Sequence, residues 1–115
     1  MGYYTSREIR VETKSKKKDR EKEIIKHLRE EYEEARYAID EDGQSIGNTK
    51  WYTDIEDLVE FSKKYPNELF IMWGEGEESY DLWKSYIKNG KFHTVSAKIT
   101  YPDYDERKLK AIGAN

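Results

Sequence analysis

Apolar and polar side chains alternate strictly near the start of the chain. From residue 3 to residue 13, Ile9 and Val11 lie on one face of the alternation, whereas Glu8 and Arg10 lie on the other. A period of two that is rich in β-branched residues predicts a strand with one buried face. We therefore expect a strand here, buried on the side of Ile9.

A helical period replaces this alternation further along the chain. Between about Lys17 and Ile39, apolar residues recur at spacings of three and four, which is typical of a helix that buries one stripe. The stripe consists of Ile24, Ile25, Leu28, Tyr32, Ala35 and Ile39. We expect one helix of about 23 residues, ended by the turn at 40–43, where Gly43 suits a left-handed conformation.

A second helix is predicted after Thr53. Thr53 and Glu56 have the spacing of a capping box, in which both side chains bond to free backbone amides at the helix start. The expected inner face contains Ile55, Leu58, Val59 and Ser62. This helix should end near Tyr65, because the residue before a proline disfavours helical geometry. Residues 44–51, which precede it, are compatible with either a short strand or an ordered loop.

The C-terminal half predicts three strands in succession. The run from Leu69 to Trp73 is apolar on both faces, as in a strand that is covered on both sides. Asn89-Gly90, between two alternating runs, predicts a hairpin with a type I′ turn that pairs Lys88 with Lys91. After the hairpin, residues 103–106 can cap a short helix that extends through residue 110.

The hairpin register sorts the side chains onto two faces. One face pairs Tyr86 with His93, Lys84 with Val95, Leu82 with Ala97 and Tyr80 with Ile99. We expect this face to lie toward the core at its far end. The other face carries Trp83, Ile87 and Phe92 among small hydroxyl residues, with Asp81 opposite Lys98. We interpret the second face as an aromatic sheet face that is available to a partner.

These elements follow the order β-α-(β)-α-β-β-β. Such an order predicts an α+β fold, a two-layer sandwich in which an antiparallel-rich sheet carries two helices on one face. The three C-terminal strands should form a meander, with the first strand beside the strand at 68–73. The length of 115 residues predicts a single domain, residues 1–115.

Composition excludes several chemistries. The chain has no cysteine, so disulfides, thiolate metal sites and cysteine nucleophiles are excluded. No apolar run approaches the roughly 18 residues that a membrane span needs, and no signal-peptide core follows Met1. We therefore expect a small soluble protein of the cytoplasm that does not act at a membrane. Among the ten tyrosines, Tyr52, Tyr101 and Tyr104 are the candidates for exposure.

The charges are segregated along the chain. Residues 1–29 carry ten basic and five acidic side chains, residues 30–82 carry four and sixteen, and residues 83–115 carry seven and three. The formal net charge of −3 therefore hides an acidic middle between two basic ends. A segregated surface charge bears on partners and solubility rather than on the fold. An ordinary solvated helix face explains the acidic block equally well.

The acidic block is the leading candidate for a partner surface. Its candidate residues are Glu30, Glu31, Glu33 and Glu34 on the long helix and Asp54 and Asp57 on the second helix. Such a surface could attract a protein with a basic surface, steer its association and exclude competitors of like charge. Trp83, Ile87 and Phe92 would supply buried area, or a contact between two copies of the chain.

Nucleic-acid binding is the alternative. Its candidate residues form a basic cluster, Lys14, Lys16, Lys17, Lys18 and Arg20, and the aromatic sheet face could stack bases. The overall acidity of the chain and the absence of an RNP-like sequence argue against this alternative.

An enzymatic function is not expected. His27 and His93 stand without partners at catalytic or metal-binding spacing. The segment Gly74-Glu-Gly-Glu-Glu78 lacks the ligand pattern of an EF-hand and the Gly-Lys-Ser/Thr of a phosphate-binding loop, so we interpret it as a solvated turn. No required set of groups converges, and we predict no catalytic residues, no metal and no cofactor.

Part of the chain resembles a known family. The stretch from Trp51 to Pro66, then Leu69-Phe-Ile71, Gly74–Glu78 and the Lys88–Lys91 turn resembles small proteins of bacteriophages and mobile elements, of the ferredoxin-like Api92/YubB type. The long charged helix of the N-terminal half departs from that pattern. The resemblance implies a ferredoxin-like sheet, a mobile-element origin and a host bacterial cell.

Together, these observations give one functional hypothesis. We expect a non-enzymatic protein-binding module of phage or mobile-element origin. It would inhibit or modulate a host or defence protein that itself binds nucleic acid, acting through the acidic helical face.

Overall fold

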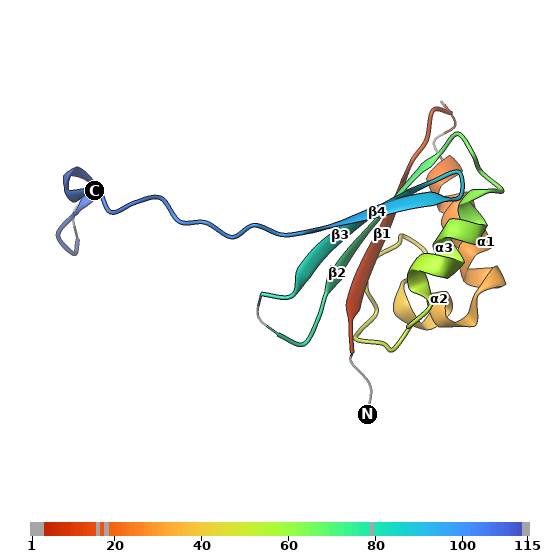
Figure 1. The fold of residues 1–115 in the computed structure, drawn as a ribbon, viewed down its shortest axis with the longest axis horizontal. Coiled ribbons are helices and arrows are strands. Elements are labelled where there is room, and N and C mark those ends of the chain that lie inside the picture. The colour runs from red at the N-terminus through yellow and green to blue at the C-terminus, as the bar shows by residue number, and fades with distance from the viewer. Residues whose placement is uncertain (1–3, 16, 18, 79, 114–115) are drawn as a thin grey trace.

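The computed structural model describes residues 4–15, 17, 19–78 and 80–113. Within these residues, a four-stranded antiparallel sheet is covered on one face by three α-helices (Figure 1). The elements are β1 (Ser6–Glu12), α1 (Arg20–Glu31), α2 (Glu33–Ala38), α3 (Asp54–Ser62), β2 (Leu69–Glu75), β3 (Leu82–Lys88), β4 (Lys91–Ser96) and a 3-10 helix (Glu106–Lys108). The predicted class, a two-layer α+β fold, is confirmed.

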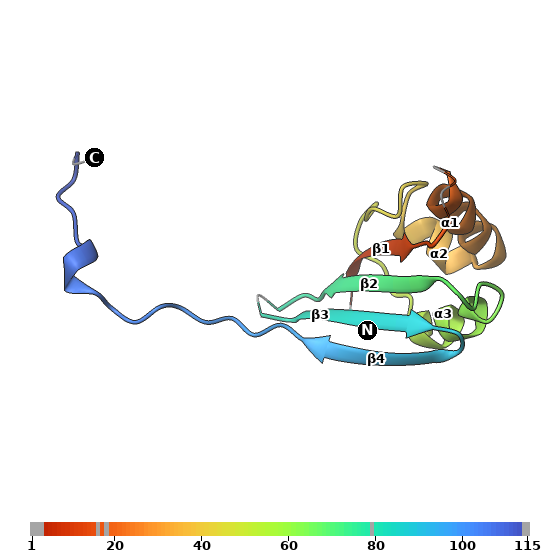
Figure 2. The same ribbon diagram turned by 90° about the horizontal axis from the view of Figure 1, so that it is seen from above.

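The strands lie in the sheet in chain order. The order is β1-β2-β3-β4, and every neighbouring pair is antiparallel (Figure 2). As expected, β1 joins the sheet beside β2, where Ile9 pairs with Met72. This order does not confirm a ferredoxin-like arrangement, which is built on split β-α-β crossovers.

The predicted hairpin is present between β3 and β4. Asn89 and Gly90 both adopt positive φ angles, 46° and 78°, as a type I′ turn requires. The strands pair from Lys88 with Lys91 outward, as the turn predicts. Beyond the strands, the Ala97 amide still donates to the Leu82 carbonyl at 2.9 Å. The expected pairs of residues 80 and 81 with 99 and 98 lie outside the ladder.

The core lies between the sheet and the helices. Sheet residues at alternate positions point toward the helices, because side chains of a strand alternate between its two faces. The buried sheet residues of this face are Ile9, Val11, Phe70, Met72 and Ile87, and they pack against Ile24, Ile25, Leu28, Leu58 and Phe61. The predicted burial of the Ile9 side of β1 is confirmed. The strand β2 was expected to be covered on both sides. On its opposite face Ile71 is buried, but Trp73 is 37% exposed, so that face is only partly covered.

The predicted long helix is broken in two. Tyr32 has φ −123° and ψ 117°, which is extended geometry, and it separates α1 from α2. The prediction of one helix from residue 17 to residue 39 was therefore wrong, and three helices cover the sheet instead of two. Because of this break, α2 runs in a different direction from α1 (Figure 1). Its residues Ala35 and Ala38, and Ile39 at its end, are buried in the core.

The start of α3 also differs from the prediction. Thr53 has φ −98° and ψ 26° and makes no capping bond to a backbone amide, so the predicted capping box is absent. Its hydroxyl donates instead to the Asp57 carboxylate at 3.0 Å. Of the expected inner face, Leu58 and Ser62 are buried, whereas Ile55 and Val59 are partly buried.

Residues 39–53 form an ordered loop rather than a strand. Two isolated bridges hold it, one between Ile39 and Ser45 and one between Thr5 and Thr49. Gly43 adopts the predicted left-handed conformation, with φ 82°, and its carbonyl accepts the Ile9 amide at 2.7 Å. The loop is thereby fixed to the edge of β1.

The chain leaves the body of the molecule after β4. We call residues 97–113 the C-terminal arm; it continues the line of β4 and extends far beyond the end of the sheet (Figures 1 and 2). The predicted terminal helix is only the 3-10 helix at Glu106–Lys108, where the Asp105 carboxylate accepts the Arg107 amide at 3.0 Å. Tyr101 and Tyr104 are exposed, as predicted.

Candidate functional site

All three helices pack on one face of the sheet, so the opposite face carries no layer of the described chain (Figure 2). We call this the open face. Strand pairing and alternation place the following side chains on it: Leu69, Ile71 and Trp73 of β2, Leu82, Lys84 and Tyr86 of β3, and His93 and Val95 of β4. An uncovered sheet face with this apolar and aromatic content is typical of a binding surface.

A row of rings and a cation crosses the open face. The ammonium group of Lys84 lies 5.1 Å from the centre of the Trp73 ring and 4.9 Å from that of Tyr86. Tyr86 in turn stacks on His93, with ring centres 5.0 Å apart. These contacts fix side chains that would otherwise lose conformational freedom when a partner binds. The row is therefore formed by contacts within the chain itself.

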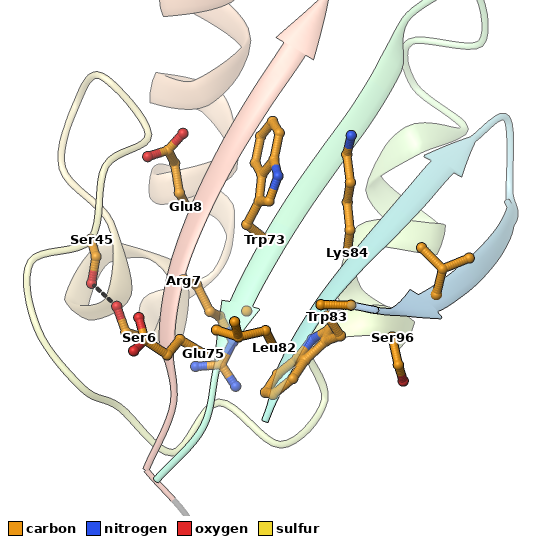
Figure 3. Close-up of a pocket in the computed structure, with 13 residues that line it drawn as sticks. Ser6, Arg7, Glu8, Ser45, Trp73, Glu75, Leu82, Trp83, Lys84 and Ser96 are labelled. Carbon is orange, nitrogen blue, oxygen red and sulfur yellow. Dashed lines mark hydrogen bonds between the residues drawn. The ribbon is translucent and has the colours of Figure 1, made fainter. Parts of the chain in front are cut away.

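A groove of about 640 Å³ lies at one end of the open face. Its apolar lining includes Trp73, Leu82 and Val95, and Figure 3 shows Trp73 and Lys84 rising side by side from β2 and β3. Its polar lining includes Ser6, Glu8, Ser45 and Glu75 together with the cationic Arg7 and Lys84, and the Ser6 hydroxyl donates to that of Ser45 at 2.9 Å. The groove crosses all four strands, so no single element forms it.

A second hollow of about 580 Å³ lies at the hairpin end. It is lined by Pro66, Leu69, Tyr86, Lys88, Asn89, Lys91, Phe92 and His93. We call it the hairpin hollow. Tyr86 belongs to both the ring row and this hollow, so the ring row connects the groove to the hairpin end of the sheet.

The predicted aromatic sheet face was wrong. Ile87 is fully buried in the core, and Trp83 is half-buried with its ring packed directly against Gly74. Phe92 is 54% exposed, but it points to the helix side from the edge strand β4. The turn fixed the pairing correctly, but pairing alone does not say which of the two faces the helices cover.

Small hydroxyl residues caused this error. Ser85 and Thr94 lie on the same face as Ile87, and hydroxyl residues of this kind are usually exposed. Ser85 is nevertheless fully buried. Its hydroxyl is satisfied there by a 2.8 Å hydrogen bond with that of Thr94. The residues that sequence reasoning missed are Trp73 and Lys84. Their signals in the sequence were the apolar run that ends at Trp73 and the hairpin register that pairs Lys84 with Val95.

The predicted acidic face is smaller than expected. Glu30, Glu33 and Glu34 are exposed at the end of α1 and on α2, and we call them the acidic patch. Asp54 instead accepts a 2.9 Å bond from buried Arg7, and Asp57 accepts 2.7 Å from the Trp51 indole. Both aspartates stabilise the body of the molecule.

Glu31 also has a partner within the molecule. It forms an ion pair with Lys64, beyond the end of α3, and lies 3.4 Å from a ring nitrogen of His27. The hydrogen bond from Lys64 lowers the pKa of Glu31 below its ordinary value of 4.5, and the positive charge of Lys64 contributes in the same direction. Glu31 therefore remains charged, and part of its charge is neutralised locally.

The basic cluster is only partly available to a ligand. Lys17 forms an ion pair with Glu23 at 2.7 Å, and the Arg20 guanidinium lies 5.2 Å from the centre of the Tyr65 ring. Lys14 is exposed. The remaining two candidates, Lys16 and Lys18, lie outside the described residues. The structure thus brings Arg20 toward the helix layer rather than toward the open face.

The two histidines occupy different environments. His27 shares a 2.6 Å hydrogen bond with the Tyr65 hydroxyl and packs edge-on against Phe61, so it belongs to the helix layer. His93 lies on the open face against Tyr86. The described residues contain no group of three or more His, Asp or Glu side chains that could hold a metal ion.

Comparisons with protein-family models, with curated proteins and with solved structures each found no match. Among the described residues, no helix has both the length and the apolar character that crossing a bilayer requires.

Proposed function

We propose that the protein is a non-enzymatic binding module that holds another protein on its open face. The observation that carries this proposal is the uncovered sheet face itself, on which Lys84 lies against the Trp73 and Tyr86 rings and Tyr86 stacks on His93. Aromatic side chains contribute large contact areas at a small cost in conformational entropy. They are therefore enriched among the residues that dominate binding energy.

The groove favours a protein segment as the ligand. Its floor is apolar at Trp73, Leu82 and Val95, while Glu8 and Glu75 line it with negative charge beside the cationic Arg7 and Lys84. The two carboxylates could accept hydrogen bonds from a basic side chain of a partner. A partner segment with apolar and basic residues fits this lining best.

The acidic patch would support binding from a distance. Glu30, Glu33 and Glu34 lie on the helix layer, away from the open face, so they would steer a basic partner rather than anchor it. Inhibition of a host or defence protein that binds nucleic acid, inside the cytoplasm of a bacterial cell, is the wider role that we propose. The support for this role is the sequence resemblance to phage and mobile-element proteins.

Affinity capture from a bacterial lysate tests the proposal. Substitution Trp73→Ser removes the largest exposed ring of the open face, and Tyr52→Ser is the matched control, because Tyr52 is 65% exposed away from that face. We expect at least one protein to be captured by the wild type and by Tyr52→Ser, and to be reduced about tenfold or more by Trp73→Ser. Equal recovery by all three chains would exclude the open face as the binding surface.

A second candidate function is nucleic-acid binding on the same face. The observation that favours it is the position of Lys84 between two aromatic rings, an arrangement that can combine base stacking with a phosphate contact. Titration of labelled single-stranded DNA and RNA at increasing salt concentration tests it. Binding that weakens steeply with salt and is lost in Trp73→Ser would support it, whereas no binding at low salt would exclude it.

A further inference from the structure

The outer edge of β4 is unpaired within the described chain. The type I′ turn makes Lys88 and Lys91 a hydrogen-bonded pair, and the bond from the Ala97 amide to Leu82 continues the same alternation. The backbone groups of Phe92, Thr94 and Ser96 therefore point away from β3, toward solvent. An edge of this kind is a template for another strand.

Few devices protect this edge. Natural sheets block an exposed edge with charges, prolines, bulges or a covering segment. β4 has a single charged residue, Lys91 at its start, and contains no proline. Its pairing with β3 is continuous from Lys91 to Ser96, without a bulge. A strand of six residues thus presents regular free backbone groups.

The first part of the C-terminal arm extends this edge. It continues the line of β4 without a partner strand (Figures 1 and 2). Its side chains Ile99 and Tyr101 are 45% and 82% exposed, so they contribute nothing to the core of their own molecule. Pro102 follows and lacks the amide that a further ladder bond would need. The chain therefore carries a strand-like segment, residues 91–101, whose second half pairs with no other strand of the described chain.

We propose that a second copy of this chain pairs with β4 and the start of the arm, antiparallel and about a twofold axis. Directly opposed residues of two antiparallel strands share a face, so the numbers of each pair must have an even sum. The register in which Ala97 faces Ala97 of the second copy satisfies this condition. It would join the two sheets into one continuous sheet of eight strands.

This register is complementary up to Pro102, which lies opposite Phe92 and donates no ladder bond. On the open face it places Val95 opposite Ile99 and His93 opposite Tyr101. On the other face it places Thr94 opposite Thr100 and Ser96 opposite Lys98. At each end, Lys91 meets Asp103, so opposite charges close the interface. Each of these contacts occurs twice because of the twofold axis.

The arm has the right length to reach the hairpin hollow of the second copy. Antiparallel pairing brings residues 101–104 beside residues 90–93 of the opposite chain, and Lys91, Phe92 and His93 line that hollow. Tyr104, which is 75% exposed in the single chain, would then have an apolar site within reach. The inference does not rest on the function proposed above, because it is argued from the free edge of β4, although Val95, Ser96 and Ala97 of the interface also line the groove.

A disulfide trap tests the register. The chain has no cysteine, so a single introduced thiol reports on one contact only. Residue 97 is in a non-hydrogen-bonded pair of the proposed interface, where the Cα atoms are about 4.5 Å apart, within the range that a disulfide accepts. We expect Ala97→Cys to form a covalent dimer at least about tenfold faster than Asn48→Cys, an exposed control position. Equal rates would overturn the register.

Sedimentation velocity of the full-length chain tests the association itself. Ser96→Pro removes an amide that points outward and leaves the bonds to β3 in place, whereas Ser96→Ala keeps the amide. We expect the wild type and Ser96→Ala to dimerise, and Ser96→Pro to dimerise about tenfold more weakly or not at all. Ile99→Asp, which lies outside the core, gives the same test if Ser96→Pro unfolds. A wild-type chain that stays monomeric up to about 1 mM would overturn the proposal.

Discussion

At the scale of single residues, one buried arginine holds the loop at 39–53 against the sheet. Arg7 is 5% exposed, and its guanidinium donates to the Asp54 carboxylate at 2.9 Å, the Thr49 hydroxyl at 2.9 Å and the Trp51 carbonyl at 2.8 Å. We predict that Arg7→Met lowers the free energy of unfolding by about 3 kcal/mol or more, because it leaves Asp54 half-buried without its partner. Urea denaturation measures this loss.

Arg10→Met is the matched control for that measurement. Arg10 lies on the open side of the same strand, its side chain is 47% exposed, and it pairs with Glu21 at 3.0 Å. An exposed ion pair contributes at most about 1 kcal/mol. If both variants shifted the urea midpoint equally, burial would not be the reason for the contribution of Arg7.

Gly43 shows a second constraint at the residue scale. Its φ of 82° is unfavourable for a side chain, and an added Cβ would lie 2.0 Å from the Ile9 carbonyl oxygen. We predict that Gly43→Ala lowers the free energy of unfolding by about 2 kcal/mol or more, measured by thermal and urea denaturation. Gly47→Ala should change it by less than about 0.5 kcal/mol, because nothing lies within 4 Å of that site. A similar loss at both sites would contradict this account.

At the scale of elements, an ion pair connects the end of α1 to the segment after α3. Lys64 lowers the pKa of Glu31. The contribution of a carboxylate with a lowered pKa is present above the pKa of the unfolded chain and is lost as pH falls through the lower pKa of the folded chain. We predict that Lys64→Met raises the NMR titration midpoint of the Glu31 carboxyl carbon toward its ordinary value of 4.5.

Lys63→Met is the control for this titration. Lys63 is the neighbouring lysine, and it pairs with Glu60 at 2.9 Å instead of Glu31. The midpoint of Glu31 should therefore stay low in Lys63→Met. A midpoint that does not move in Lys64→Met would show that Lys64 does not cause the lowered pKa.

At the scale of the whole molecule, the body and the arm are energetically separate. All described residues from 98 onward are exposed except Asp105, which is half-buried, and none belongs to the core cluster. We predict that a chain ending at Ala97 keeps the same core, so that the methyl NMR signals of Ile24 and Leu28 stay in place. A chain ending at Lys88 should lose them, because removal of β4 uncovers the edge of β3. Collapse of the core signals in the first chain would contradict the separation.

Local sequence signals predicted most of the elements. The period of two found β1, Asn89-Gly90 found the hairpin with its register, and Gly43 marked a left-handed turn. These signals are reliable because each depends on the backbone geometry of a few consecutive residues. The break at Tyr32 had no such signal, because the apolar stripe continues through it.

The candidate site was predicted less well than the fold. Tyr86 and His93 were correctly paired, but only the far end of their face was expected to lie toward the core, whereas Trp83 and Ile87 were placed on the surface. All the acidic candidates were predicted to form one partner surface. Asp54 and Asp57 instead bond within the molecule, whereas Glu30 is exposed on the helix layer. Partners that lie far apart along the chain, such as Arg7 and Asp54, leave no local pattern.

By itself, the sequence determined the strands, the hairpin register and the α+β class, because these follow from periodicity and turn chemistry within short segments. Only the tertiary structure decided which face of the sheet the helices cover, and therefore that Trp73, Lys84 and Tyr86 lie on the open face. The physical reason is that a strand offers its two faces in strict alternation, and the choice between them depends on packing against helices that are remote in the chain.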